Sequence, residues 1–301
     1  MTDALSTAED RLFDSHSVPV RTRSLQLADP GLEIAVHETG RGKPVIFVHG
    51  SGMSAATWAP LLAHLPNRHA IALDLPGFGG SDAYSYIGRP LREHAVAQLS
   101  STLDALGLER AAIVGTSLGA MWALNLAFAA PERVSSVVVL GMPAVALPGL
   151  RPDPYFKLLT TPGLGRLAAR GPTPKNAAAA RKGMARALGQ RAVERLPDEF
   201  FDVVRTGMAK PGWGQAMWSH LNLAMRYGHA RPENAFTDDQ LRSINAPVQL
   251  IWGDRDAYGG PEIGQRAAAV LPDARLEVIK GGHAPFLDDP ERCADLIRQT
   301  T

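Results

Sequence analysis

The chain has 301 residues, of which 45% are apolar and 20% are charged, so it is long and apolar enough to bury a substantial core. Its 29 Gly and 23 Pro residues are scattered without a period, which excludes collagen-like, low-complexity and coiled-coil chains. A net charge of +1 argues against a nucleic-acid-binding protein, and the single cysteine, Cys293, excludes an intrachain disulfide and a cysteine-based zinc site.

The N-terminal 20 residues are polar on balance, and the sequence leaves open whether they are loosely ordered or pack against the body. They contain no basic stretch followed by an apolar run, which is the pattern of a secretory leader. The longest apolar stretch, 137–150, is broken by two prolines and is too short to span a bilayer. We therefore expect a cytoplasmic protein without a membrane span.

Short β-rich runs then alternate with helical runs, which predicts a mostly parallel eight-stranded α/β sheet with helices on both faces. The first two strands alternate polar and apolar residues and are predicted to form an antiparallel edge. In chain order, the predicted strands are 24–28, 33–38, 45–48, 69–74, 111–115, 134–140, 248–252 and 276–279. The predicted helices between them are 55–65, 90–106, 118–130, 261–271 and 290–299.

Residues 144–235 interrupt this alternation. The segment contains no convincing strand and five predicted helices, at 155–160, 164–170, 176–188, 192–208 and 214–227. It holds 14 Lys and Arg against 6 Asp and Glu, whereas the rest of the chain holds 17 against 24. This change in composition predicts a helical cap, 144–235, inserted into one α/β core formed by 1–143 and 236–301.

The sharpest local pattern is the run from Gly115 to Gly119, which reads G-T-S-L-G between an apolar strand and a helix. A G-x-S-x-G pattern in that context is typical of a nucleophile elbow, a sharp turn that exposes the serine while its glycines let strand and helix approach. The pattern predicts Ser117 as the nucleophile and the N–H of Leu118, at the start of the helix, as an oxyanion donor. From about residue 44 onward the chain resembles the α/β-hydrolase fold family.

That resemblance implies a catalytic acid and then a histidine, in this chain order. The G-D-R-D run ending at Asp256 is similar to the family's G-x-x-D and points to Asp256, while Asp254 is the competitor with a turn-capping role. The loop at 141–144, from which some relatives take the acid, holds no carboxylate. The K-G-G-H run ending at His283 is similar to the family's G-G-H turn, and His283 is the predicted base.

Two further loops extend the resemblance. A strand ending in His49-Gly50 is similar to the family's oxyanion loop, which implies that the N–H of Ser51 joins that of Leu118, with His49 in a structural role. The glycine-rich run 74–82 also resembles a family loop, and its expected role is structural. Among the other histidines, His220 and His229 lie in the predicted cap and could approach the site, with surface or pocket lining as the simpler interpretation.

The sequence lacks the residues that several other activities and binding sites would require. A serine rather than an aspartate at the elbow argues against dehalogenase and epoxide-hydrolase activity. Gly42-Lys43 does not complete a phosphate-binding loop, and no H-E-x-x-H pattern or cysteine cluster indicates a metal site, so we expect neither a cofactor nor a metal.

Substrate selection is expected from the predicted cap, because the family's cap roofs the pocket. An apolar stripe there either packs the cap onto the body or, in part, lines an acyl or alkyl pocket. The candidate pocket residues are Gly52, Met53, Phe156, Trp213, Met217, Trp218 and Leu221. Residues 151–195 carry ten basic and two acidic side chains, which either attract an anionic substrate or, as we favour, form a solvated face.

The leading hypothesis is a serine hydrolase that cleaves a small-to-medium, largely apolar ester or lactone through a Ser-His-Asp triad and an acyl-enzyme. An alternative is carbon–carbon hydrolysis of vinylogous diketo acids, although this chain has Thr116 where those relatives usually carry Asn, and Ala284 where they often carry Trp. A cofactor-free perhydrolase or haloperoxidase-like activity is a further alternative, and a non-turnover ligand receptor is a distant one. The expected partner is the small-molecule substrate, with the protein a monomer or homodimer.

Overall fold

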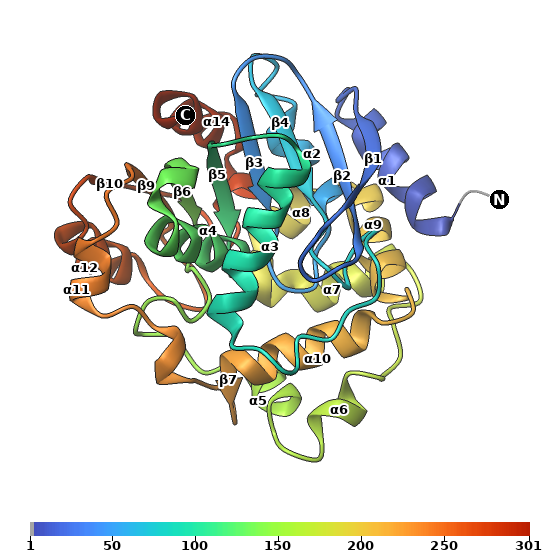
Figure 1. Cartoon of the computed structure of the whole chain (residues 1–301). Coiled ribbons are helices and arrows are strands. Elements are labelled where there is room, and N and C mark those ends of the chain that lie inside the picture. The colour runs from blue at the N-terminus through green and yellow to red at the C-terminus, as the bar shows by residue number, and fades with distance from the viewer. Residues whose placement is uncertain (1–2) are drawn as a thin grey trace.

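An eight-stranded sheet with the order β1-β2-β4-β3-β5-β6-β9-β10 forms the centre of the computed structural model, which describes residues 3–301 (Figure 1). β1 pairs antiparallel with β2, β2 pairs antiparallel with β4, and the remaining neighbours are parallel. The predicted mostly parallel sheet and its antiparallel edge are therefore confirmed. The strands are β1 (Arg21–Gln26), β2 (Glu33–Thr39), β3 (Pro44–Val48), β4 (His69–Leu73), β5 (Ala111–Thr116), β6 (Val134–Leu140), β9 (Val248–Gly253) and β10 (Ala274–Ile279).

Helices cover both faces of this sheet because successive side chains of a strand point to opposite faces. In β6, Val137 and Val139 pack into one apolar cluster and Val138 and Leu140 into the other. One face carries α3 (Leu91–Ala105), α4 (Leu118–Ala129) and α12 (Pro261–Val270), and the other carries α2 (Ala59–Leu62) and α14 (Pro290–Thr300). The shorter helices outside residues 144–235 are η1 (Ala55–Trp58), η2 (Pro131–Arg133), α11 (Asp238–Arg242) and α13 (Pro285–Asp288), and a further short helix, η3 (Pro232–Asn234), lies at the end of that segment.

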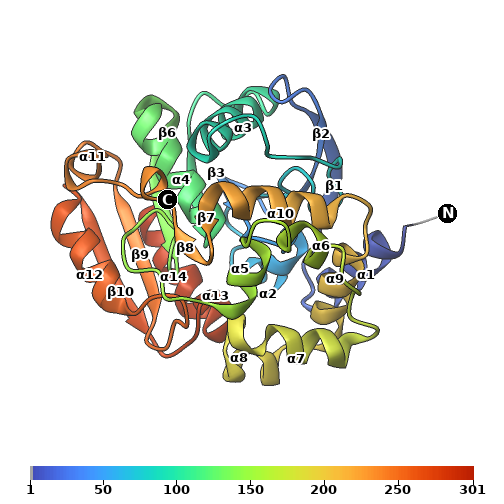
Figure 2. The same ribbon diagram turned by 90° about the horizontal axis from the view of Figure 1, so that it is seen from below.

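The chain leaves the sheet at the carboxyl end of β6 and re-enters it at the amino end of the parallel neighbour β9, so two adjacent strands flank the long excursion. Figures 1 and 2 show α5, α6, α7 and α10 gathered at one end of the sheet. That the 144–235 segment is a separate cap unit stays a prediction. Its elements are α5 (Pro154–Leu159), α6 (Gly165–Ala168), α7 (Ala177–Leu188), α8 (Gln190–Arg195), α9 (Asp198–Met208), α10 (Trp213–Ala224), β7 (Met225–Arg226) and β8 (His229–Ala230).

Two predictions for this segment are wrong. The single helix expected at 192–208 is two helices, because Leu196 precedes Pro197 and takes an extended conformation (φ −68°, ψ 140°) that ends α8. The absence of strands is also wrong, since β7 and β8 form a short antiparallel hairpin. Each strand has two residues, which is too short for any periodic pattern in the sequence.

The N-terminal residues, whose packing the sequence left open, form the helix α1 (Ala4–Ser15) beside α9 (Figure 1). Its N-cap is Asp3, whose carboxylate accepts the N–H of Leu5. One face, made of Leu5, Ala8, Leu12 and Phe13, is buried. The spacing of these residues is that of one helical face, so α1 is held by burial of an amphipathic stripe. Over residues 3–301, every helix is too short or too polar to traverse a lipid bilayer.

Candidate active site

Ser117 lies at the turn between β5 and α4, with φ 51° and ψ −117°. A positive φ is strained for a residue with a Cβ, and the turn around it is correspondingly crowded. A Cβ on Gly119 would overlap the Val48 carbonyl, and one on Gly115 would overlap the backbone of α4. The two outer glycines of the G-x-S-x-G run are therefore required by the close approach of strand and helix.

Asp256 and His283 are in direct contact. His283 Nδ1 lies 3.0 and 2.9 Å from the two carboxylate oxygens of Asp256, which is fully buried. The carboxylate also accepts the backbone N–H groups of Met142, at 2.8 Å, and Tyr258, at 2.9 Å. The loop at 141–144 follows β6 and has no carboxylate of its own. Through Met142 it instead donates a hydrogen bond to Asp256, which follows the neighbouring strand β9.

The electrostatics of this pair define the tautomer of the histidine. Burial alone raises the pKa of Asp256, but the His283 charge and the hydrogen bonds to the carboxylate outweigh burial and lower the pKa below its usual value. An ionised carboxylate only accepts hydrogen bonds, so the imidazole carries its proton on Nδ1. The Nε2 lone pair is then free to accept a proton from another group.

Asp254 has a different role, because its carboxylate accepts the N–H of Gly281 at 3.0 Å and so ties the acid loop to the histidine loop. On the other side of the histidine loop, the carboxylate of Asp288 accepts the N–H of Gly282 at 2.8 Å. These two carboxylates hold the turn that precedes His283.

The predicted oxyanion loop lies against the elbow. A Cβ on Gly50 would come within 3.1 Å of Ser117 Cβ. Ser51 and Leu118 line a space of about 20 Å³ together with Ser117 and His283. His49 is buried, and its Nε2 accepts the N–H of Leu75 at 3.0 Å, which is the structural contact expected of it.

His220 also reaches this site, from α10. Its Nδ1 lies 2.9 Å from the Ala216 carbonyl and its Nε2 lies 2.9 Å from the Ser51 hydroxyl. Since a carbonyl can only accept, Nδ1 donates and the Ser51 hydroxyl donates to Nε2. Burial lowers the pKa of His220 to about 4, so the ring stays neutral near pH 7. The sequence raised His220 only as a possible neighbour of the site. His229, raised with it, is exposed.

A cavity of about 340 Å³ adjoins the predicted oxyanion loop at Ser51, and it is lined by five of the seven predicted pocket residues: Gly52, Met53, Phe156, Trp213 and Met217. Leu221 instead lines the smaller space at Ser117. Trp218 is not among the lining residues, and its ring lies 5.8 Å from the Arg166 guanidinium. Trp218 follows Met217 directly, so it is rotated by about 100° around the helix and faces α6 instead.

Sequence reasoning missed several lining residues. Tyr258 stacks on Phe156 at 5.3 Å and meets the His283 ring edge to face at 4.6 Å. Tyr258 is two residues after the predicted acid, Asp256, and this position could have indicated that it lies near the site. Met184 and Arg186 come from α7, and the Arg186 guanidinium pairs with Asp153 at 2.6 Å. Among the residues that line these spaces, Arg186 is the only arginine or lysine, and it already has an acidic partner.

One group among the described residues has the donor atoms of a metal site, and it consists of Glu9, His37 and Asp74. None of the three lines the spaces at Ser117. The loop that Asp74 begins has the structural role expected of it, because this carboxylate accepts the N–H groups of Ala55 and Gly80 at 2.6 and 2.7 Å.

Comparison with known proteins gives the following similarities. The model of a family described as "Alpha/beta hydrolase family" matches residues 45–296. The chain is 28% identical over 296 residues to a 2-hydroxy-6-oxononadienedioate/2-hydroxy-6-oxononatrienedioate hydrolase of Paraburkholderia phymatum, covering 94% of this chain and 96% of the relative. It is 30% identical over 275 residues to hydrolase 2 of the same name from Pseudomonas putida, covering 87% and 90%. The fold is similar to that of carboxylesterase CesB from Bacillus subtilis, with a TM-score of 0.78, 23% identity and coverage of 98% and 96%.

Proposed function

The chain belongs to the alpha/beta hydrolase family, and from that premise we propose that it hydrolyses small-to-medium, largely apolar carboxylic esters or lactones. The observation that carries the proposal is that His283, hydrogen-bonded to Asp256, borders the same small space as the strained Ser117. A nucleophile, a base and an orienting acid in one site are the components of acyl transfer.

In the proposed mechanism, His283 Nε2 takes the proton of the Ser117 hydroxyl as its oxygen attacks the substrate carbonyl. Asp256 holds the imidazole through Nδ1 and stabilises its charged form. The N–H groups of Ser51 and Leu118 stabilise the tetrahedral oxyanion, which collapses to the acyl-enzyme as His283 returns the proton to the departing alcohol. Water, deprotonated by His283, then hydrolyses the acyl-enzyme to the carboxylic acid and restores the Ser117 hydroxyl. The serine–histidine contact required for this transfer is one that often tightens only when substrate binds.

The charge of the cavity favours a neutral substrate. The Arg186 side chain is the one arginine or lysine of the lining, and Asp153 neutralises it at 2.6 Å. The buried Asp153 carboxylate offsets the one basic charge of the lining, so the lining formed by the described residues offers no excess positive charge to attract an anionic substrate. The remaining walls are dominated by Met53, Met184, Met217 and aromatic rings, which suit an apolar acyl or alkyl group.

A second candidate is carbon–carbon hydrolysis, because relatives 28–30% identical to this chain are named as dienedioate hydrolases. Two positions weigh against it. The Thr116 hydroxyl donates to the Leu140 carbonyl at 2.9 Å, so it is engaged inside the sheet. Ala284, next to His283, offers only a methyl group.

The test combines a fluorophosphonate probe with two substrate sets. Intact-mass spectrometry of the wild type should show one adduct, absent in Ser117→Ala and present in Ser243→Ala, whose serine is exposed and outside the site. p-Nitrophenyl esters of increasing chain length should turn over, with kcat reduced at least about 10³-fold in Ser117→Ala. Turnover of a 2-hydroxy-6-oxo-dienoate but not of the esters would select the second candidate. No adduct on Ser117 would overturn both.

A further inference from the structure

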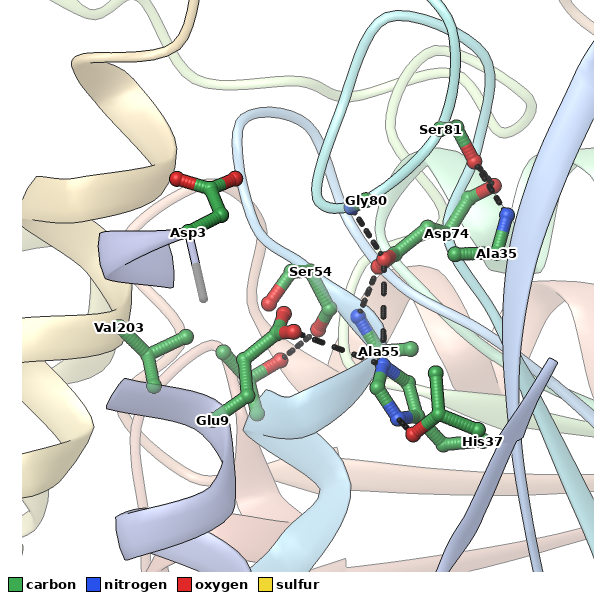
Figure 3. A network of polar contacts seen from close by, with 12 residues as sticks. Asp3, Glu9, Ala35, His37, Ser54, Ala55, Asp74, Gly80, Ser81 and Val203 are labelled. Atoms are coloured by element: carbon green, nitrogen blue, oxygen red, sulfur yellow. Dashed lines mark hydrogen bonds and ion pairs between the residues drawn. The ribbon is translucent and has the colours of Figure 1, made fainter. Parts of the chain in front are cut away.

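Three buried side chains from separate elements converge behind the oxyanion loop (Figure 3). Glu9 comes from α1, His37 from β2, and Asp74 from the end of β4, and their exposed fractions are 5%, 2% and 0%. His37 Nε2 lies 3.8 Å from a carboxylate oxygen of Glu9 and 3.9 Å from one of Asp74. These separations exceed the range of hydrogen bonds, so the three groups face one another without bonding directly.

Unsatisfied polar atoms accumulate at the same point. Within residues 3–301, Glu9 Oε1, His37 Nε2 and the Ser54 hydroxyl have no hydrogen-bond partner, although all three are buried. His37 Nδ1 lies 2.9 Å from the Thr22 hydroxyl, which fixes the ring with Nε2 toward the carboxylates. A buried polar group without a partner is costly, so three in one place call for a common partner.

We propose that Glu9, His37 and Asp74 bind one divalent transition-metal cation, with Zn²⁺ as the representative ion. The possible ligand atoms lie within 4.8 Å of one another, and an ion equidistant from three such atoms lies about 2.2–2.5 Å from each. A contraction of a few tenths of an ångström reaches the ~2.0–2.2 Å of zinc–nitrogen and zinc–oxygen bonds. One imidazole with two carboxylates suits Zn²⁺ or Mn²⁺, and the two negative charges match the charge of the ion.

Asp74 is already oriented for this role. Its carboxylate accepts the N–H groups of Ala55 and Gly80, and each oxygen keeps a second lone pair for an ion. Ser54 directly precedes Ala55, whose N–H binds Asp74, and its buried hydroxyl oxygen, unpaired among the described residues, is a candidate fourth ligand. The cation would therefore join α1 to β2, to the end of β4 and to η1, which begins where the oxyanion loop ends.

The site is structural rather than catalytic. Its three ligands are buried and none lines the spaces at Ser117, so a substrate has no access to the ion. A closed metal site contributes binding free energy to folding. The inference is independent of which bond Ser117 attacks.

The test measures zinc in the full-length protein. After incubation with Zn²⁺ and dialysis, elemental analysis of the wild type should give one zinc per chain, and EDTA should lower its Tm. Glu9→Gln and His37→Gln should each weaken zinc affinity at least tenfold and remove the response of the Tm to EDTA. The matched control is Glu38→Gln, because Glu38 is the next residue on β2 but pairs with His69 at 2.8 Å outside the cluster. Glu38→Gln should keep one zinc.

X-ray absorption spectroscopy of the zinc-loaded wild type identifies the atoms bound to zinc, so this measurement tests the proposal even if a variant fails to fold. One imidazole nitrogen with oxygen donors at about 2.0–2.2 Å is the expected coordination. A wild type that takes up neither Zn²⁺ nor Mn²⁺ and whose Tm ignores EDTA would overturn the proposal and leave a water or a shared proton between these groups. Equal zinc content in wild type and His37→Gln would also overturn it.

Discussion

The turn at Ser117 requires a glycine at position 119, because even the methyl group of an alanine would overlap a backbone atom. The Val48 carbonyl occupies the volume that a Cβ would need, and this carbonyl belongs to the backbone of β3, which cannot rotate away. Ser117 next to it already adopts a positive φ. Strain at Ser117 is sustained because the packing of β3, β5 and α4 leaves the turn no other conformation.

We predict that Gly119→Ala lowers the free energy of unfolding by about 3 kcal/mol or more, because a backbone atom must move to admit the side chain. Gly183→Ala is the matched control, since Gly183 lies within α7 with no atom near the added Cβ, and should stabilise by about 0.5–1 kcal/mol. Urea denaturation of both variants checks this. Equal effects would show that the turn relaxes.

Asp256 links activity to stability. Asp256→Asn should reduce kcat by about 10³–10⁴-fold, because an amide does not select the Nδ1-protonated tautomer. The pKa of Asp256 is lowered in the fold, so its contribution to stability is complete above the unfolded pKa, near 3.8, and is lost as the pH falls through the lower folded pKa. The stability difference between wild type and Asp256→Asn should thus be constant above about pH 5 and change below pH 4. A difference independent of pH from 5 to 2 would contradict this assignment.

At the scale of elements, α1 is the part of the molecule least visible in the sequence. Its helix is short and polar on its outer face, and its stability comes from docking onto α9 and η1. The same helix carries Glu9 to the proposed metal site. Elements with a strong local pattern were predicted more accurately, and β6 was predicted with its observed bounds. The break between α8 and α9 was missed because it depends on one proline, Pro197.

Leu12→Ala should lower the free energy of unfolding by about 2–5 kcal/mol, because Leu12 is fully buried between α1 and the body. Leu167→Ala on α6 is the control, since Leu167 is 70% exposed, and its effect should stay within about 0.5 kcal/mol. Thermal or urea unfolding measures both. A small effect of Leu12→Ala would mean that α1 undocks without affecting the rest.

At the scale of the whole molecule, buried neutral histidines make the fold sensitive to acid. Burial lowers the pKa of His49, His94 and His220 below 6.5. In the unfolded chain these rings bind protons below about pH 6.5, whereas in the fold they resist protonation. Stability is therefore full above this pH and is lost as the pH falls, by up to about 1.4 kcal/mol per pH unit for each histidine.

We predict that His220 makes the fold less stable as the pH falls from 6.5 to 5, so that His220→Gln makes the change of the free energy of unfolding over this interval more favourable than in the wild type. The carboxyls of Glu9 and Asp288, whose pKa values burial raises, act in the opposite direction but are present in both proteins. His229→Gln is the control, because His229 is exposed, and it should keep the wild-type slope. Urea titrations at half-unit pH intervals give the slope. An unchanged slope in His220→Gln would show that this ring does not titrate between the two states.

Local sequence patterns were enough to predict the sheet, the elbow and the loops that carry Asp256 and His283. These features depend on local physics: strand periodicity, turns that only glycine permits, and residues a few positions apart. Even Trp218 follows the same rule in retrospect, because its angle from Met217 on α10 already placed it on another face.

Contacts between groups that are far apart in the chain become visible only in the folded protein. The N–H of Met142 reaches Asp256, His220 reaches Ser51, and Glu9 reaches His37, across separations of 114, 169 and 28 residues. Pairings of this kind carry no periodic or motif signal, because the atoms involved are brought together by the packing of whole elements rather than by any neighbour in the chain. The ion pair between Arg186 and Asp153, which bears on substrate choice, is another contact that no local pattern in the sequence indicates.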